Sequence, residues 1–184
     1  MRKLARILLA AALMVGAVAV YASVASGHKG GGGSGNANGR HDNQGQKHRR
    51  GQPVLDASLA PSQVGDPTIH GVVAGGAPWV LDRGEVKIKR DGKFKLRVKG
   101  LVIPSPAGNN TPGPVTTVSA SLYCGADSDT TAADTTAAVP LSSSGDARIR
   151  DDSFNTPSTC LAPVILLHPN GNAAAYIAVD GWRF

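Results

Sequence analysis

The residues of this chain whose types and spacing could do chemistry are six basic side chains within residues 85–100, EVKIKRDGKFKLRVKG. They alternate with apolar residues on either side of an Asp-Gly turn: Lys87, Lys89, Lys93, Lys95, Arg97 and Lys99. Because side chains of a β-strand alternate between its two faces, this pattern places the basic groups together on one face. A dense cationic face attracts anionic polymers.

Two interpretations of this face remain open. Lysines on an exposed strand protect against edge-to-edge aggregation, and the face would then be merely solvated. Alternatively, it binds an anionic cell-wall polymer, an acidic polysaccharide or extracellular nucleic acid. Nucleic acid is the poorest of these partners, because no aromatic residue is interleaved for base stacking.

The basic residues are segregated along the chain. Residues 54–184 contain 11 basic and 12 acidic residues, but eight of the basic ones lie within 83–99. Only three basic residues follow Gly100, against seven acidic ones. The formal charge of +6 for the whole chain therefore conceals one cationic segment in an otherwise acidic domain.

Metal binding at a processed N-terminus is a second possible chemistry. Cleavage after Ala25 would leave Ser26-Gly27-His28, in which the amine, two deprotonated amides and the imidazole can surround a metal in a plane. Square-planar nitrogen ligation suits Cu(II) or Ni(II). Cleavage after Ser26 would keep a smaller version of this site, and cleavage after Ala22 would remove it. A histidine this close to the end of a tail can equally occur by chance.

Catalytic motifs are missing from the sequence. It contains no HExxH, no GxSxG, no phosphate-binding glycine loop and no paired-cysteine zinc spacing. His70 and His168 are the only histidines beyond residue 53, and either would need an acid brought near it by the fold. Three aspartates of GADSDTTAAD could offer oxygen ligands to calcium, without a defined loop pattern: Asp127, Asp129 and Asp134. A binding module is favoured, with an extracellular enzyme of unrecognisable active site as the alternative.

The N-terminus has the layout of a secretory signal peptide. Three basic residues within the first six precede an apolar run that ends at Ala25 in small residues. We place the signal peptide at residues 1–25. An uncleaved membrane anchor is the other interpretation, because about 18 apolar residues can span a bilayer. The protein is expected to be secreted and, through its basic face, associated with the cell wall.

Residues 26–53 are predicted to form a disordered tether. The segment is rich in Gly, Asn and Gln, and Ala37 is its only aliphatic residue before the final Pro53. Such a composition buries too little apolar area to offset the entropy of ordering the chain. Five basic residues and one acid, Asp42, give the tether a positive bias.

Cys124 and Cys160 are the two cysteines of the chain. In an oxidising compartment an even pair in a small domain predicts a disulfide. Closing this loop would stabilise the fold by about 4 kcal/mol in the chain-entropy model. A metal site would need further cysteines or histidines, and only His168 is close in sequence.

Residues 54–184 are predicted to form a single antiparallel β-sandwich, immunoglobulin-like or similar, with seven to nine short strands. Apolar residues do not recur at helical spacing, whereas β-branched residues alternate with turn signals throughout. The expected strands are 68–74, 78–82, 85–89, 93–103, 115–124, 135–141, 146–151, 162–168 and 173–182. We expect the domain to be monomeric.

The register of the basic hairpin follows from burial. A three-residue turn ending at Gly92 pairs Ile88 with Phe94 and Val86 with Leu96, whereas a two-residue turn would mix apolar and basic groups on each face. Gly92 would then take the left-handed conformation that such turns need. Five apolar residues are expected to be buried: Val86, Ile88, Phe94, Leu96 and Val98. The same register sets lysine opposite lysine, which costs stability.

Two further strands carry explicit expectations. In residues 115–124 an apolar set (Val118, Ala120, Leu122 and Cys124) alternates with a polar one (Thr117, Ser119, Ser121 and Tyr123). We expect the first set to be buried and the second to face water. The run PVILL, residues 163–167, is apolar on both faces and is therefore the expected central strand.

The segment GEVKIKRDGKFKLRVKGLVIP, residues 84–104, and the ending AAYIAVDGWRF resemble small secreted proteins of unknown function from high-GC actinobacteria. This resemblance covers most of the chain after Leu59 and implies no activity or site residues. The shorter stretch RDGKFKLRVKGL is similar to the strand pair of chordin-like CHRD β-domains, which implies an antiparallel β-fold.

Overall fold

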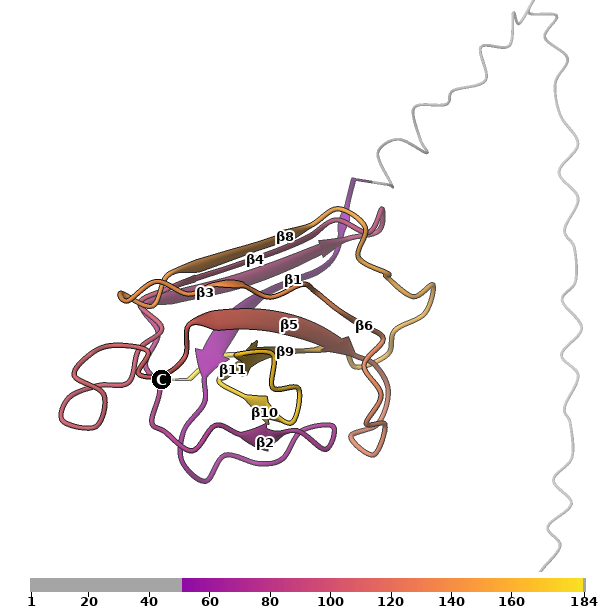
Figure 1. Ribbon diagram of the computed structural model, residues 1–184. Helices are drawn as coiled ribbons and strands as arrows, with labels where there is room; N and C mark the ends of the chain where they lie inside the picture. The colour runs from indigo at the N-terminus through magenta and orange to yellow at the C-terminus, as the bar shows by residue number, and fades with distance from the viewer. Residues whose placement is uncertain (1–50, 184) are drawn as a thin grey trace, which may run out of the picture. The chain divides into compact units, whose positions relative to one another are not determined.

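The computed structural model describes residues 51–183, which form eleven β-strands and no α-helix (Figure 1). The strands are β1 Pro53–Pro61, β2 Val73–Ala74, β3 Arg83–Lys89, β4 Phe94–Lys99, β5 Thr117–Tyr123, β6 Asp134–Thr135, β7 Val139–Pro140, β8 Ala147–Asp151, β9 Val164–Pro169, β10 Ala175–Tyr176 and β11 Ala178–Asp180. This part of the chain holds no helix long and apolar enough to cross a membrane. The predicted signal peptide and the tether up to residue 50 lie outside the described residues.

Nine strands belong to one antiparallel sheet. Its order is β6-β5-β9-β11-β1-β3-β4-β8, with β7 also paired to β5, and β2 and β10 form a small parallel pair beside it. The prediction of an all-β, antiparallel fold is confirmed. The sheet curls, so that β3, β4 and β8 lie in one layer and β5, β9 and β11 in another (Figure 1).

Strand β1 joins the two layers and was not predicted. Its first part pairs with β3 up to Ser58, and its last three residues pair with β11 from Leu59 onward. Because β1 belongs to both layers, the sheet is continuous, whereas an immunoglobulin-like sandwich has two separate sheets. The strand begins at Pro53, the last residue assigned to the tether. Its signal in the sequence is the alternation of Leu55, Ala57 and Leu59 with Asp56 and Ser58.

One apolar core fills the space between the layers. The layer of β3, β4 and β8 contributes Val86, Ile88, Phe94, Leu96, Val98, Ala147 and Ile149. The opposite layer contributes Val118, Ala120, Leu122, Ile165, Leu167 and Ala178. Phe94 packs against Phe154 from the loop after β8, with ring centroids 4.7 Å apart. Burial of these side chains is the main force that holds the curled sheet closed.

The predicted register of the basic hairpin is confirmed. Ile88 pairs with Phe94 and Val86 with Leu96, and Gly92 has φ +79° at the end of the turn. All five apolar residues that this register was expected to bury are at most 1% exposed. The outer face of β3 and β4 is consequently left to the charged residues.

The expectation that one face of β5 is wet was wrong. Ser119, Ser121 and Tyr123 are buried, because the β2–β10 pair and its loops cover that face. The Ser121 hydroxyl is within 2.8 Å of the Thr135 hydroxyl, and the Tyr123 ring stacks on His70 at 5.0 Å. Small polar side chains with local partners can lie under such a cover, so their alternation in the sequence did not indicate solvent.

Strand β9 is central, as predicted for PVILL. It lies between β5 and β11, and Ile165, Leu166 and Leu167 are fully buried. Its two faces contact the main core and the smaller cluster beneath the β2–β10 pair.

The disulfide between Cys124 and Cys160 is confirmed. Their Cα atoms are 5.1 Å apart, within the usual range for a disulfide. The bond joins the end of β5 to the loop that precedes β9, and the amide of Gly125 donates to the carbonyl of Leu161 beside it at 2.7 Å.

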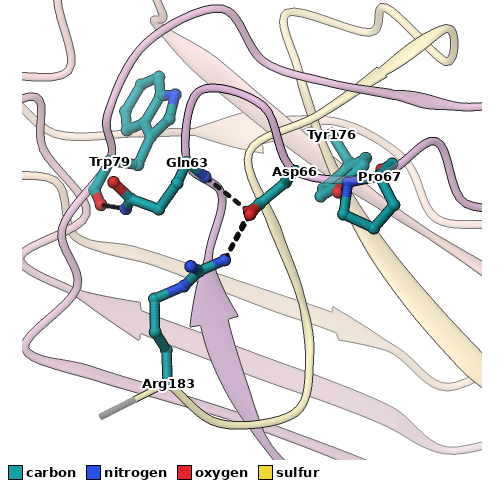
Figure 2. A network of polar contacts seen from close by, with 6 residues as sticks. All are labelled: Gln63, Asp66, Pro67, Trp79, Tyr176 and Arg183. Carbon is teal, nitrogen blue, oxygen red and sulfur yellow. Dashed lines mark hydrogen bonds and ion pairs between the residues drawn. The ribbon is translucent and has the colours of Figure 1, made fainter.

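A polar network holds the loop after β1 against the C-terminal segment (Figure 2). Nη2 of Arg183 donates to both carboxylate oxygens of Asp66 at 2.7 and 2.6 Å, and the Gln63 amide donates to the same carboxylate at 2.7 Å. Burial alone would raise the pKa of Asp66, but these donors outweigh it and lower the pKa. The Tyr176 hydroxyl donates to the carbonyl of Pro67 at 2.8 Å. The network therefore fixes the C-terminal segment without contributing to the cationic face.

Candidate functional site

The cationic face is the outer surface of β3 and β4. Lys87, Lys95, Arg97 and Lys99 alternate there with the buried core residues and are exposed. Lys93 lies at the hairpin turn and is also exposed, while Lys89 is half-buried at the end of β3. The structure thus brings the six predicted residues to one hairpin, and five of them lie on the strands themselves.

Strand β8 adds two arginines that the sequence interpretation left in the acidic remainder of the domain. Arg150 lies directly opposite Lys95, and Arg148 opposite Arg97. Both arginines are exposed and alternate with the buried Ile149. The alternation in DARIRD was visible in the sequence, but the pairing of β8 with β4 was not, because the two strands are separated by a long connection.

The face lies largely on interior strands. β3 is flanked by β1 and β4, and β4 is flanked by β3 and β8. Only β8 ends the sheet on this side. Protection of a sheet edge therefore accounts for Arg148 and Arg150, and does not account for basic residues on β3 and β4.

Four directly opposed pairs on this face have like charge. They are Arg83–Lys99, Lys87–Lys95, Lys95–Arg150 and Arg97–Arg148. Side chains directly opposed in an antiparallel pair are close neighbours, and like charges there reduce stability. The folded domain accordingly carries an electrostatic cost at this surface.

Carboxylates border the face at the β1 side and at the turn. Asp56 on β1 forms an ion pair with Lys87 at 2.8 Å and raises the pKa of that lysine. Glu85 on β3 lies opposite Arg97 on β4, but its carboxylate and the Arg97 guanidinium do not form an ion pair. At the turn, Lys93 pairs with Asp91 at 3.4 Å.

Four neighbouring cations are left without an ion pair. Among residues 51–183, no carboxylate lies within 4.0 Å of the basic nitrogens of Lys95, Arg97, Arg148 or Arg150. We call these four residues the cationic cluster. Because they are exposed, their charge is available to a ligand in solution.

The cationic cluster surrounds an open hollow of about 300 Å³. Its remaining lining comes from Lys87, Asp56 and Glu85 at one side, and from the strand segments at Val86, Leu96 and Ile149. A second hollow of about 340 Å³ shares Arg97 and Arg148 and extends to Lys99, Pro140 and Asp146. The surface can therefore receive a chain that passes over the Arg97–Arg148 pair.

The two domain histidines have structural contacts. Nδ1 of His70 donates to the carbonyl of Asp129 at 2.8 Å, and Nδ1 of His168 donates to the carbonyl of Ala175 at 2.8 Å. Within the described residues, neither ring is hydrogen-bonded to a carboxylate. The carboxylate of Asp127 instead accepts the backbone amide of His70 at 2.6 Å. Burial lowers the pKa of His168, which favours its neutral form.

The candidate metal ligands are not gathered in the part of the chain that the structure describes. Asp134 accepts the backbone amides of Thr135 and Asn155, and residues 51–183 contain no cluster of three His, Cys, Asp or Glu side chains suited to a metal ion. His28, the predicted Cu(II) ligand, lies outside the described residues.

Comparison with protein-family models, with curated proteins and with solved structures finds no match for this chain. The geometry of the cationic face consequently carries the functional argument.

Proposed function

We propose that this protein is a secreted, non-catalytic module that binds an anionic polymer of the cell envelope through the outer face of β3, β4 and β8. The observation that carries the proposal is the cationic cluster: four exposed, unpaired cations around one hollow, two of them on an interior strand. A polyanion placed there would offset the repulsion between the opposed cations.

Solvation alone is the weaker explanation of this surface. A soluble domain needs charged residues outside, but mixed signs with compensating neighbours supply solubility at a lower electrostatic cost. The acids on the outer face of the strands are Asp56 on β1 and Glu85 on β3, and two more, Asp91 and Asp146, border the face at its ends. The outer face of β4 and β8 itself presents only cations, at residues 95, 97, 99, 148 and 150. Because acidic and basic residues are separated at this surface, we favour a bound anionic ligand over solvation alone.

Two features beyond the face support the proposal. The Cys124–Cys160 disulfide suits an oxidising, extracellular compartment, in agreement with the predicted signal peptide. The predicted tether, residues 26–53, carries five basic residues and one acid. A second weak cationic segment on the same chain would raise the avidity for a long polyanion.

The test is retention of the mature protein on immobilised cell-wall polyanion at two salt concentrations. A face variant replaces the cationic cluster by glutamine: Lys95→Gln, Arg97→Gln, Arg148→Gln and Arg150→Gln. A control variant removes the same number of charges from the tether: Arg40→Gln, Lys47→Gln, Arg49→Gln and Arg50→Gln. We expect the face variant to lose retention at low salt and the control variant to keep most of it. The reason is that cations held close together on a folded surface jointly attract the polyanion.

Equal retention of the parent and the face variant at low salt would reject the proposal. Circular dichroism and thermal unfolding of both variants establish that the fold is intact. The face variant is expected to unfold at the same or a higher temperature than the parent, since it removes like-charge pairs.

A further inference from the structure

The path of positive charge over the cationic face has a direction. Across the sheet toward β1 it meets Glu85 opposite Arg97 and Asp56 beyond Lys87, and only at Lys99 does a cation, Arg83, end the row on β3. In the other direction it ends at the sheet edge after β8. Along β4 it is uninterrupted from Lys95 through Arg97 to Lys99. A bound polyanion therefore gains most by lying parallel to β4.

Strand β8 doubles this path over part of its length. Arg150 stands beside Lys95 and Arg148 beside Arg97, so two successive steps along β4 each present a pair of cations. Beyond them, the carboxylate of Asp146 accepts the amide of Gly100 at 3.0 Å and lines the second hollow with Lys99. Along β4 and β8 the two cation pairs thus stand without a carboxylate, whereas the next step, at Lys99, is bordered by Asp146.

The backbone spacing of the two pairs is set by the strand. Residues two apart on a β-strand are separated by about 6.7 Å. That distance corresponds to six extended backbone bonds, since each residue contributes three bonds and about 3.3–3.6 Å. A flexible polyanion can therefore place one charge over each cation pair when six bonds separate its successive charged atoms.

A phosphodiester polymer of a three-carbon polyol has this repeat. From one phosphorus to the next its chain runs through oxygen, three carbons and oxygen, which makes six bonds. Each phosphate carries one negative charge and two free oxygens, a shape that the planar guanidinium groups of Arg97, Arg148 and Arg150 bind through paired hydrogen bonds.

Other polyanions fit less well. Uronate polysaccharides carry their carboxylates on rigid rings that alternate in direction along an extended chain, so charges on one side recur only at every second sugar. Single-stranded nucleic acid also has six bonds between phosphorus atoms, but its bases need aromatic or apolar stacking partners. The residues that line the two hollows include no aromatic side chain.

From this geometry we infer that the ligand of the cationic face is a linear polyol phosphate with a three-carbon repeat, bound parallel to β4. One phosphate lies over the Lys95–Arg150 pair and the next over the Arg97–Arg148 pair. The inference rests on the proposed function and specifies the chemical class of its polymer.

The test uses short synthetic oligomers with four phosphates each, titrated into the mature protein by calorimetry at low and moderate salt. The first ligand has three-carbon spacers. The matched control ligand has 1,5-linked five-carbon spacers, which place eight bonds, about 9 Å, between charges. An oligogalacturonate with four carboxylates and a tetrathymidylate with a terminal phosphate, which also carries four phosphates, complete the set.

We expect the three-carbon oligomer to bind about tenfold more tightly than the five-carbon one, a difference of about 1.4 kcal/mol. The variant Arg97→Lys, Arg148→Lys keeps the charge and loses the planar donors, so it should bind the three-carbon oligomer more weakly and reduce the preference between the two spacers.

Equal affinity for both spacers, or tighter binding of the oligogalacturonate or the tetrathymidylate, would overturn the inference and leave the binding of anionic polymers standing. Failure of every ligand to bind at low salt would overturn the proposed function as well.

Discussion

Arg97 on β4 lies directly opposite Arg148 on β8 in an antiparallel pair. Both side chains are exposed, and within residues 51–183 no carboxylate forms an ion pair with either of them. The Lys95–Arg150 pair repeats the arrangement two residues along the strands. The like-charge pairs thus lower the stability of the folded domain and favour the binding of anions. A substitution at this surface should therefore change stability and anion binding in opposite directions, and both can be measured.

Arg148→Glu is predicted to stabilise the domain and weaken binding. It converts a repulsive pair with Arg97 into an attractive one, a change worth about 1 kcal/mol at low ionic strength. Urea unfolding measures the stability, and retention on polyanion measures the binding. Arg148→Gln should give an intermediate stability, because it removes the repulsion without adding attraction. A loss of stability in Arg148→Glu would contradict the electrostatic account of this pair.

Removal of the disulfide tests the link between β5 and the loop before β9. The double variant Cys124→Ala, Cys160→Ala should lose about 4 kcal/mol of unfolding free energy, because the unfolded chain regains the entropy of the open loop. Denaturant unfolding of the oxidised parent and of the variant gives the value. A loss below about 1 kcal/mol would mean that other contacts already hold this loop in place.

Gly92→Ala should destabilise the hairpin by more than about 1 kcal/mol. Gly92 has φ +79°, and an added Cβ would lie 2.7 Å from the carbonyl oxygen of Phe154. Gly171→Ala is the matched control, because Gly171 has φ +69° and no atom within 4 Å of the added Cβ. The difference between the two variants in thermal unfolding isolates the cost of the close contact. Equal losses of stability in the two variants would show that the loop carrying Phe154 moves away from the added Cβ without a measurable loss of free energy.

His168 predicts a pH dependence of stability. Burial lowers its pKa in the folded state, and its Nε2 atom has no partner among the described residues. As the pH falls below the ordinary histidine pKa of about 6.5, this side chain becomes protonated in the unfolded chain but stays neutral in the folded domain. The unfolding free energy therefore decreases. This contribution is complete above that pH and is lost on acidification toward the lowered pKa.

His168→Asn should flatten this dependence, since the asparagine amide can still donate to the carbonyl of Ala175 and does not titrate. Urea unfolding of the parent and the variant between about pH 7.5 and 5.5 makes the comparison. Asp180, whose pKa is raised by burial, acts with the opposite sign, and because it is present in both proteins its contribution cancels in the comparison. Parallel stability curves for the two proteins would exclude His168 as the titrating group.

The features that sequence reasoning predicted are local or set by simple burial. The register of the hairpin follows from keeping Ile88 and Phe94 on one face, and the bond between Cys124 and Cys160 follows from there being two cysteines in a chain predicted to be exported. The central position of β9 follows from its apolar residues on both faces.

The features that were missed depend on contacts distant in the sequence. The pairing of β4 with β8 brings Arg148 to Arg97, and nothing in either segment specifies that pairing. The burial of Ser119 and Tyr123 depends on a cover supplied by β2 and β10, which lie before and after β5 in the chain. The same long-range pairing completes the cationic cluster, so the sequence predicted its hairpin half and not its β8 half.

The central claim is that the outer face of β3, β4 and β8 is a binding surface, and chemical-shift mapping tests it most directly. A polyol phosphate oligomer is titrated into isotope-labelled mature protein at low salt, and the amide signals are followed. We expect saturable shifts concentrated at residues 95–99 and 147–151, with the buried strand β9 unaffected. Shifts confined to residues outside this face, or no shifts at all, would contradict it.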